Sequence, residues 1–262
     1  ESGRNALKEK RVITSYLAGK NNGAVILSED EGTSVLLNGE DHVRIQVLCN
    51  GMDIQSCFKK ANEIDDYIDA HFDYAFDEKY GYKTTFPTNT GTGMKAGYTL
   101  HLPSLSDARR LNDISAELGR FGLKFRTVYG DGQNGYGNLY QISTQKTLGQ
   151  DEREVIKDLD DIVMQIVNQE KEQREHFYKK DKIQMDDEIY KSYGVLKYAR
   201  KLSLKDSMVL ISELMTGISL GVLQFAHNGR YNINELIMDI QPAVLRQNSG
   251  KAMSVAETDV LR

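Results

Sequence analysis

The apolar pattern of this sequence changes near Gly149, and that change limits the fold more than any other feature. From about residue 23 to 148, short runs of β-branched and aromatic residues alternate with two helical stretches, at residues 53–74 and 105–120. After Gly149 the strand signal disappears, and apolar residues recur with a period of roughly 3.6 inside a charged surface.

The pattern predicts two domains. We expect residues 1–149 to form an α+β domain, in which one antiparallel sheet is flanked by helices, and residues 150–262 to form an all-helical C-terminal region. The expected strands lie in the segments GAVILSE, TSVLLN, HVRIQVLC, AGYTLHLP, LKFRTVYG and NLYQIST. Polar segments at residues 227–230 and 246–250 are expected to be turns.

Composition argues against several classes of protein. The net charge is -5 with acids and bases interspersed, whereas general nucleic-acid binding needs a basic surface. No apolar run approaches the roughly 18 residues of a membrane span, and the N-terminus lacks the apolar core of a signal peptide. Cys49 and Cys57 cannot build a disulfide framework, so we expect them to be small buried apolar residues in a reducing cytoplasm.

Charged groups interrupt one of the expected strands, VLLNGEDHVRIQVL. In an extended chain Glu40, His42, Arg44 and Gln46 would share one face, and the apolar residues between and after them would share the other. A polar face turned to solvent is the simplest explanation of this alternation. A row of functional groups presented from a rigid strand is the second explanation.

Two glycine-rich segments place further charges at strand ends. YGYKTTFPTNTGTGMKAGYTLHLP carries Lys95 at the start of a strand, and FRTVYGDGQNGYGNLYQIS carries Arg126 and Asp131. Such loops let backbone N–H groups approach a phosphate closely, although each alone is typical of a turn or a hairpin. Their combination with the interrupted strand predicts one pocket that receives Arg126, Lys95, Glu40 and Arg44.

These three segments also resemble a known family. NGEDHVRIQ resembles the NEEDH signature strand of the ATP:guanido phosphotransferases, FPTNTGTGMKAG resembles their CPTN-GTGLRA loop, and FRTVYGDG resembles their arginine-led flexible loop. Together with KIQMDDEIYKSYGVL, they are most similar to the McsB-type bacterial protein-arginine kinases, rather than to creatine or arginine kinases. The resemblance runs from about residue 9 to the end, and it implies a guanido kinase/glutamine synthetase-like catalytic domain.

The activity that the resemblance implies is transfer of the γ-phosphoryl group of ATP to arginine side chains of proteins. Mg²⁺ would bridge the nucleotide phosphates, without metal ligands from the protein. Glu40 would be the catalytic carboxylate, and Asp131 would hold the substrate guanidinium. The residues implied in nucleotide binding are Arg44, Lys95, Ala96, Gly97, Tyr98, Thr99, Arg126, Thr127, Val128, Tyr129 and Gly130.

The resemblance further implies a cytoplasmic role in the stress response. The expected partners are protein substrates with exposed arginines, a zinc-binding activator protein and Clp-type protease machinery, with neither nucleic acid nor membrane among them. A homodimer is left open.

Several positions depart from the family pattern. Gly39 replaces the first Glu of the signature, Phe86 replaces the loop Cys, Lys95 replaces an Arg, Asp131 replaces a Glu, and Tyr16 replaces a nucleotide-contacting His. At position 95 a lysine cannot form the bidentate fork of an arginine. At position 131 an aspartate is one methylene shorter than a glutamate and leaves a gap of roughly 1.5 Å. Misplacement of a catalytic group by about 1 Å can cost on the order of 100-fold in rate.

Two further family features differ at the ends of the sequence. The S-x-R-x-R segment of the family's small N-terminal domain is not found. The R-D-x-x-R-A motif, which binds phosphoarginine allosterically, corresponds to a degenerate end with Thr258, Asp259 and Arg262. Two main hypotheses stay open: an active protein-arginine kinase, and a catalytically inactive binding or scaffolding module. A kinase of free guanidines is the third, and the helical C-terminal half argues against it.

Overall fold

Two three-stranded antiparallel sheets form the centre of the computed structural model, which describes residues 2–131, 134–224 and 232–262. The first sheet has the order β1 (Ala24–Leu27), β2 (Thr33–Leu37), β3 (Val43–Val47), and the second has the order β6 (Gly97–His101), β10 (Leu139–Thr144), β7 (Leu123–Thr127). All six expected strands are present, and the α+β class is confirmed. The expectation of one continuous sheet is wrong, because no ladder between β3 and β6 joins the two sheets within these residues.

Short elements complete the strand-rich part of the chain. Two-residue strands form two hairpins, β4 (Phe76–Asp77) with β5 (Gly81–Tyr82), and β8 (Gly130–Asp131) with β9 (Asn134–Gly135). The 3-10 helix η1 (Pro87–Asn89) lies between β5 and β6.

Helices cover the sheets and form the C-terminal part. They are α1 (Ser2–Glu9), α2 (Ser15–Gly19), α3 (Ile54–Asp69), α4 (Pro103–Asp107), α5 (Leu111–Arg120), α6 (Glu152–Lys180), α7 (Lys182–Tyr198), α8 (Leu204–Ser219), α9 (Ile233–Asp239), α10 (Pro242–Ser249) and α11 (Val255–Thr258). The helical character expected after Gly149 is therefore confirmed for the described residues. The expected turn at residues 227–230 lies outside them.

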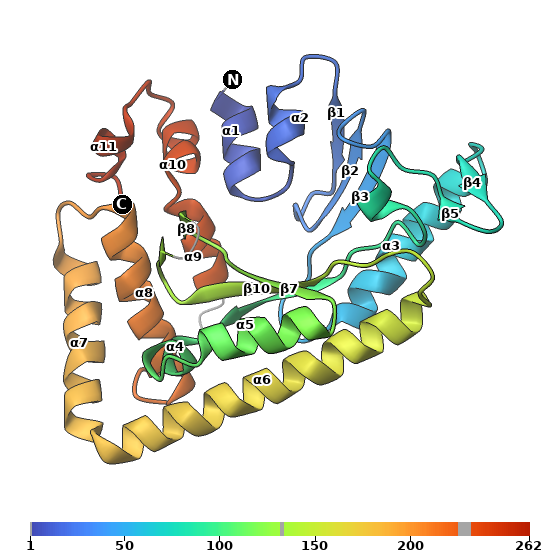
Figure 1. Ribbon diagram of the computed structural model, residues 1–262. Helices are drawn as coiled ribbons and strands as arrows, with labels where there is room; N and C mark the ends of the chain where they lie inside the picture. The colour runs from blue at the N-terminus through green and yellow to red at the C-terminus, as the bar shows by residue number, and fades with distance from the viewer. Residues whose placement is uncertain (1, 132–133, 225–231) are drawn as a thin grey trace.

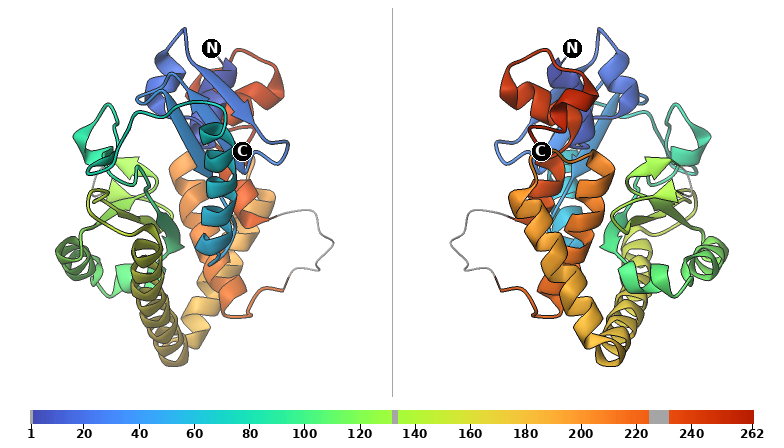
Figure 2. Two further views of the ribbon diagram at one scale, coloured as in Figure 1. Left: turned by 90° about the vertical axis from the view of Figure 1, so that its right-hand side faces the viewer. Right: turned by 90° about the vertical axis from the view of Figure 1, so that its left-hand side faces the viewer.

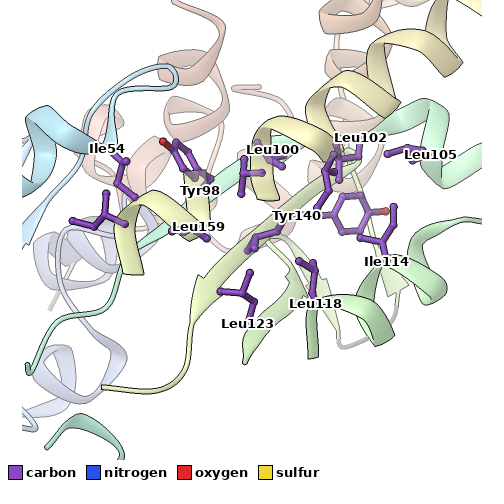
Figure 3. Close-up of a cluster of buried hydrophobic side chains, with 14 residues drawn as sticks. Ile54, Tyr98, Leu100, Leu102, Leu105, Ile114, Leu118, Leu123, Tyr140 and Leu159 are labelled. Carbon is purple, nitrogen blue, oxygen red and sulfur yellow. The ribbon is translucent and has the colours of Figure 1, made fainter. Parts of the chain in front are cut away.

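The main apolar core lies between the second sheet and the helices α5 and α6. Side chains from one face of the sheet, including Tyr98, Leu100 and Ile142, pack against Leu118 of α5 and Leu159 of α6 (Figure 3). Ile142 is completely buried. The residues between them point to the opposite face. That face is covered by α8 at His101 and Leu139 and is free of the core around Thr99, Lys124 and Arg126.

The long helix α6 connects the sheet core to the C-terminal helices. Asp151 caps its N-terminus by accepting hydrogen bonds from two backbone N–H groups, and Lys179 and Lys180 lie in its last turn, where positive charge complements the helix dipole. Figure 1 shows α6 along the bottom of the molecule, reaching the foot of α7. In the side views of Figure 2 the second sheet lies on one side of α6, and α7 and α8 lie on the other.

A buried polar network joins the sheet to the helical part. Glu170 of α6 accepts backbone hydrogen bonds at the start of α4, at 3.1 and 2.9 Å, and it pairs with Arg174 at 2.8 Å. In α8, Ser212 lies 2.8 Å from Nε2 of His101 and accepts a 3.1 Å hydrogen bond from Asn138. Each polar group in this network has a partner, so burying it does not leave a group unsatisfied.

Three local expectations are corrected. The helix expected at residues 105–120 is two helices, because Arg109 adopts a left-handed φ of 57° between α4 and α5. The turn expected at residues 246–250 is the end of α10, which Gly250 terminates with a φ of 64°. Cys49 is exposed rather than buried, and it is bonded to Cys57, because α3 turns back along β3.

His101 predicts a loss of stability in acid. Burial lowers its pKa to about 3, with Arg174 adding to the effect, whereas an unfolded histidine titrates near 6.5. Neutral His101 therefore makes its full contribution to the free energy of unfolding above pH 6.5. This contribution decreases at lower pH, by up to about 2 kcal/mol between pH 7 and pH 5. His101→Gln should reduce this difference in urea unfolding at the two pH values. The same substitution at exposed His71 is the control, and an unchanged pH dependence in His101→Gln would contradict the prediction.

Candidate functional site

The free face of the second sheet carries rows of polar side chains. Strand register places Arg126, Gln141 and Thr99 opposite one another across the three strands, and it places Lys124 beside Ser143 in the next row. Lys124, Arg126 and Thr99 are exposed. These residues alternate with the core residues, so the packing of the core determines where the cations lie.

Arg126 is oriented by a neutral neighbour. Its Nε donates to Oε1 of Gln141 at 2.7 Å, and its Nη2 contacts the same oxygen. An amide oxygen fixes the direction of the guanidinium without neutralising it. The positive charge of Arg126 therefore stays available to an anion.

Lys95 lies at the end of a chain of hydrogen bonds that holds the TNTGTG loop. Its Nζ donates to Oδ1 of Asn89 at 2.5 Å, and Nδ2 of Asn89 donates to Oδ2 of Asp41 at 3.2 Å. The other carboxylate oxygen of Asp41 accepts from the backbone N–H of Thr85 at 2.7 Å. Removal from water lowers the pKa of Lys95, and the nearby charges of Arg44 and Lys124 lower it further.

Glu40 lies in a turn and not on a strand, contrary to the sequence prediction. β2 ends before Asn38, whose φ is 57° and whose N–H donates to the carbonyl of His42 at 2.8 Å, and β3 begins only after this turn. The half-buried carboxylate of Glu40 accepts a 3.0 Å hydrogen bond from the hydroxyl of Thr14. Arg44 does lie on β3, exposed between half-buried apolar neighbours, as expected.

The structure brings the predicted cations together in two neighbouring groups. Arg44 and Lys95 interact electrostatically with each other, and Lys124 joins them. Arg126 interacts with Arg11, which the sequence analysis did not consider. Convergence of these groups with Glu40 on a single pocket stays a prediction.

Several residues implied in nucleotide binding do not turn their side chains to this face. Ala96 and Tyr98 belong to the main core, and the hydroxyl of Tyr98 donates to Asp160 at 2.6 Å. Val128 and Tyr129 pack against an apolar cluster of α8 and α9. All four side chains thus take part in packing, with Tyr98 buried and the other three half-buried.

The remaining implied loop residues are less informative. Gly97 lies on β6, where an added Cβ would come within 2.6 Å of a carbonyl oxygen of β10, so the close approach of the strands requires glycine. Thr127 is half-buried at the end of β7, and Gly130 begins β8. The side chain of Asp131 lies outside the described part of the structure.

The other departures from the family pattern have different surroundings. At Gly39 an added Cβ would meet nothing closer than 3.8 Å, so this turn has room for a side chain. Phe86 is 49% exposed at the start of η1. Tyr16 is also exposed and packs against Lys20, whose Nζ lies 4.7 Å from the ring centroid.

The side chain of Arg262 is buried and forms hydrogen bonds to neighbouring segments of the chain. Only 1% of its side chain is exposed; the guanidinium pairs with Asp259 at 2.6 Å and donates to the carbonyls of Leu202 and Ile240 at 2.9 and 2.8 Å. It also donates to the hydroxyl of Thr258 at 3.1 Å. These bonds tie α11 to the end of α9 and to the segment before α8.

The sequence analysis missed four residues of this region: Arg11, Asp41, Asn89 and Lys124. Lys124 could have been found, because it precedes Arg126 by two positions and therefore shares its face of the strand. Asp41 could not have been found in this way, because its contacts with Thr85 and Asn89 depend on chain folding rather than on a local pattern.

Neither a membrane segment nor a metal cluster is found in the described residues. No helix among them is long and apolar enough to cross a bilayer. No group of three or more His, Cys, Asp or Glu side chains in these ranges could hold a metal ion.

Comparison with known proteins identifies the family. Residues 1–173 match the model of the ATP:guanido phosphotransferase C-terminal catalytic domain, and residues 182–262 match the protein-arginine kinase McsB C-terminal domain. A protein-arginine kinase of Bacillus pumilus is 41% identical over 98% of this chain and 70% of that protein. The protein-arginine kinase of Bacillus subtilis is 40% identical over the same shares.

Solved structures support the fold. The duplicated taurocyamine kinase of Schistosoma mansoni, with bound transition state analog components, superimposes with a TM-score of 0.56 at 19% identity, over 65% of this chain and 25% of that one. With these matches over nearly its whole length, the chain belongs to the ATP:guanido phosphotransferase family, on its protein-arginine kinase branch.

Proposed function

We propose that this chain transfers the γ-phosphoryl group of ATP to arginine side chains of proteins. The observation that carries the proposal is a group of cations: Lys124 and Arg126 lie on the free face of the second sheet, and Lys95, in the loop that leads into β6, is near both Lys124 and Arg44. Phosphoryl transfer builds negative charge on the transferred group and depends on such prearranged positive charge. The family membership and the names of the relatives support the same activity.

ATP is the proposed cofactor, with Mg²⁺ held through its phosphates. The side chains around the proposed phosphate site are mainly cationic, and they fit phosphate oxygens rather than a metal ion. Backbone N–H groups of the glycine-rich loop before Lys95 are suited to the same oxygens. The hydrogen-bond chain from Asp41 through Asn89 would keep this loop in place while a nucleotide binds.

Glu40 is the proposed acceptor of the guanidinium proton. A carboxylate in this role must orient the attacking nitrogen and remain ionised before transfer. The hydroxyl of Thr14 donates to one carboxylate oxygen, Oε2, and this contact fixes the side chain. Within the described part of the chain Oε1 accepts no hydrogen bond, so this atom is suited to the substrate.

The proposal includes an activity weaker than that of a kinase with the full family pattern. Lys95 offers a point charge in place of a planar fork, and exposed Phe86 offers a ring in place of a thiol. These two positions also favour the second candidate function, a guanido-kinase-like binding or scaffolding module in protein quality control. The activator protein and the Clp-type protease remain proposed partners for either function.

Replacing Glu40 should separate phosphoryl transfer from nucleotide binding. Glu40→Gln keeps an oxygen that can accept from Thr14 but cannot take a proton, so transfer should fall by about 100-fold or more. Affinity for a non-hydrolysable ATP analogue should stay within about twofold, since the cations are untouched. Calorimetry and mass spectrometry of phosphoarginine measure the two quantities. Glu31→Gln, which removes the partner of Lys10, is the matched control. Full transfer activity in Glu40→Gln would exclude this role.

Lys95→Arg should raise turnover by a few fold. An arginine at this position could form two hydrogen bonds to phosphate, whereas the lysine forms a point contact. The control is Lys83→Arg, since Lys83 lies earlier in the same loop region and pairs with Asp77 at 3.5 Å. The initial rates of both variants with ATP and an unfolded arginine-rich protein test the prediction. If the rate of Lys95→Arg is equal to or below that of the unchanged chain, the lysine at position 95 does not limit phosphoryl transfer.

A further inference from the structure

Arg11 has an unusual backbone conformation, and its side chain reaches the segment that follows β7. It follows α1 with a φ of 63°, a left-handed value that few residues other than glycine adopt. Its N–H donates to the carbonyl of Lys8 at 3.0 Å, and its own carbonyl accepts from Nε2 of Gln46 at 2.6 Å. Bonds on both sides therefore hold this conformation, and Gln46 ties it to β3.

The guanidinium of Arg11 contacts the chain directly after β7. Its Nη2 donates to the carbonyl of Val128 at 2.6 Å, and its Cζ lies 5.0 Å from the centroid of the Tyr129 ring. A cation at this distance from an aromatic ring is attracted to its face. One planar side chain thus binds two consecutive residues, and it does so across 117 positions of sequence.

These two residues connect Arg126 to the β8 strand. β7 ends one residue after Arg126, and β8 begins directly after Tyr129. Burial lowers the pKa of Arg11; Tyr129 acts against this shift, and the charge of Arg126 adds to it.

We propose that Arg11 is a positioning residue of the phosphate site: it holds the backbone at Val128 and Tyr129 and thereby fixes the direction of Arg126. The catalytic consequence of this inference rests on the proposed function. The contacts of Arg11 with Val128 and Tyr129, called the tether below, can be tested separately. Arg11 holds the chain through one hydrogen bond and the contact of its planar guanidinium with the Tyr129 ring, so Lys, which keeps the charge and lacks the planar group, should not replace it.

The tether is tested by hydrogen exchange on the full chain. Arg11→Met and Arg11→Lys should both increase amide exchange in peptides that cover residues 126–131, while peptides from α6 stay unchanged. Lys10→Met is the matched control, since Lys10 is the preceding residue and pairs with Glu31 on the other side. Unchanged exchange in both Arg11 variants would overturn the inference, whatever their activity.

The catalytic consequence is tested by the split between kcat and KM. Both Arg11 variants should lose about tenfold or more in kcat, because a displacement of about 1 Å can cost on the order of 100-fold. In Arg11→Lys, affinity for the ATP analogue should stay within about threefold. Wild-type kcat in Arg11→Lys would overturn the inference, since charge alone would then suffice.

A double-mutant cycle separates positioning from general destabilisation. Tyr129→Leu removes the ring that Arg11 contacts, so the losses in kcat from Arg11→Met and Tyr129→Leu should be less than additive. Additive losses, or a fall in the melting temperature that accounts for them, would overturn the inference. Absence of transfer by the unchanged chain would instead refute the proposed function, and the exchange comparison would still decide the role of Arg11.

Discussion

The site depends on one constraint: in the part that carries Lys124, Arg126 and Thr99, the sheet of β6, β10 and β7 is buried on one face only. Packing Tyr98, Ile142 and Phe125 toward α5 and α6 forces the residues between them onto the other face. A slip of the register by one residue would carry Lys124 and Arg126 into the core, at a large cost in free energy. The apolar contacts that stabilise the domain therefore also determine where its cations lie.

Cations gathered on one face repel one another, and the structure holds them mainly with neutral partners. Gln141 orients Arg126, and Asn89 orients Lys95, without cancelling either charge. Asp41 is the carboxylate nearest to Lys95 in this chain of contacts, and both of its oxygens already accept hydrogen bonds from the loop. The result is a positive surface whose geometry is set before an anion arrives, as electrostatic stabilisation of phosphoryl transfer requires.

Strand positions could be predicted from the sequence, but the contacts between distant segments could not. Alternation located all six main strands and the exposed face of Arg44, because a half-buried strand leaves a period of two in the sequence. The turn around Glu40 was missed because it depends on the left-handed backbone of Asn38. The family resemblance of the whole segment implied that Tyr98 binds the nucleotide. The period of two along the strand instead places Tyr98 on the face opposite to that of Lys95, which is the core face.

The helices α8 and α9 pack against the strand ends that lie near the site. Tyr129 packs on the apolar cluster of α8 and α9, and Ser212 of α8 contacts both His101 and Asn138, which lie at the ends of β6 and β10. At Gly137 an added Cβ would come within 2.9 Å of Met208, so the strand end and α8 are in close contact. A shift of α8 would therefore have to move the start of β10 and the chain after Arg126 together, because densely packed elements transmit displacement instead of absorbing it.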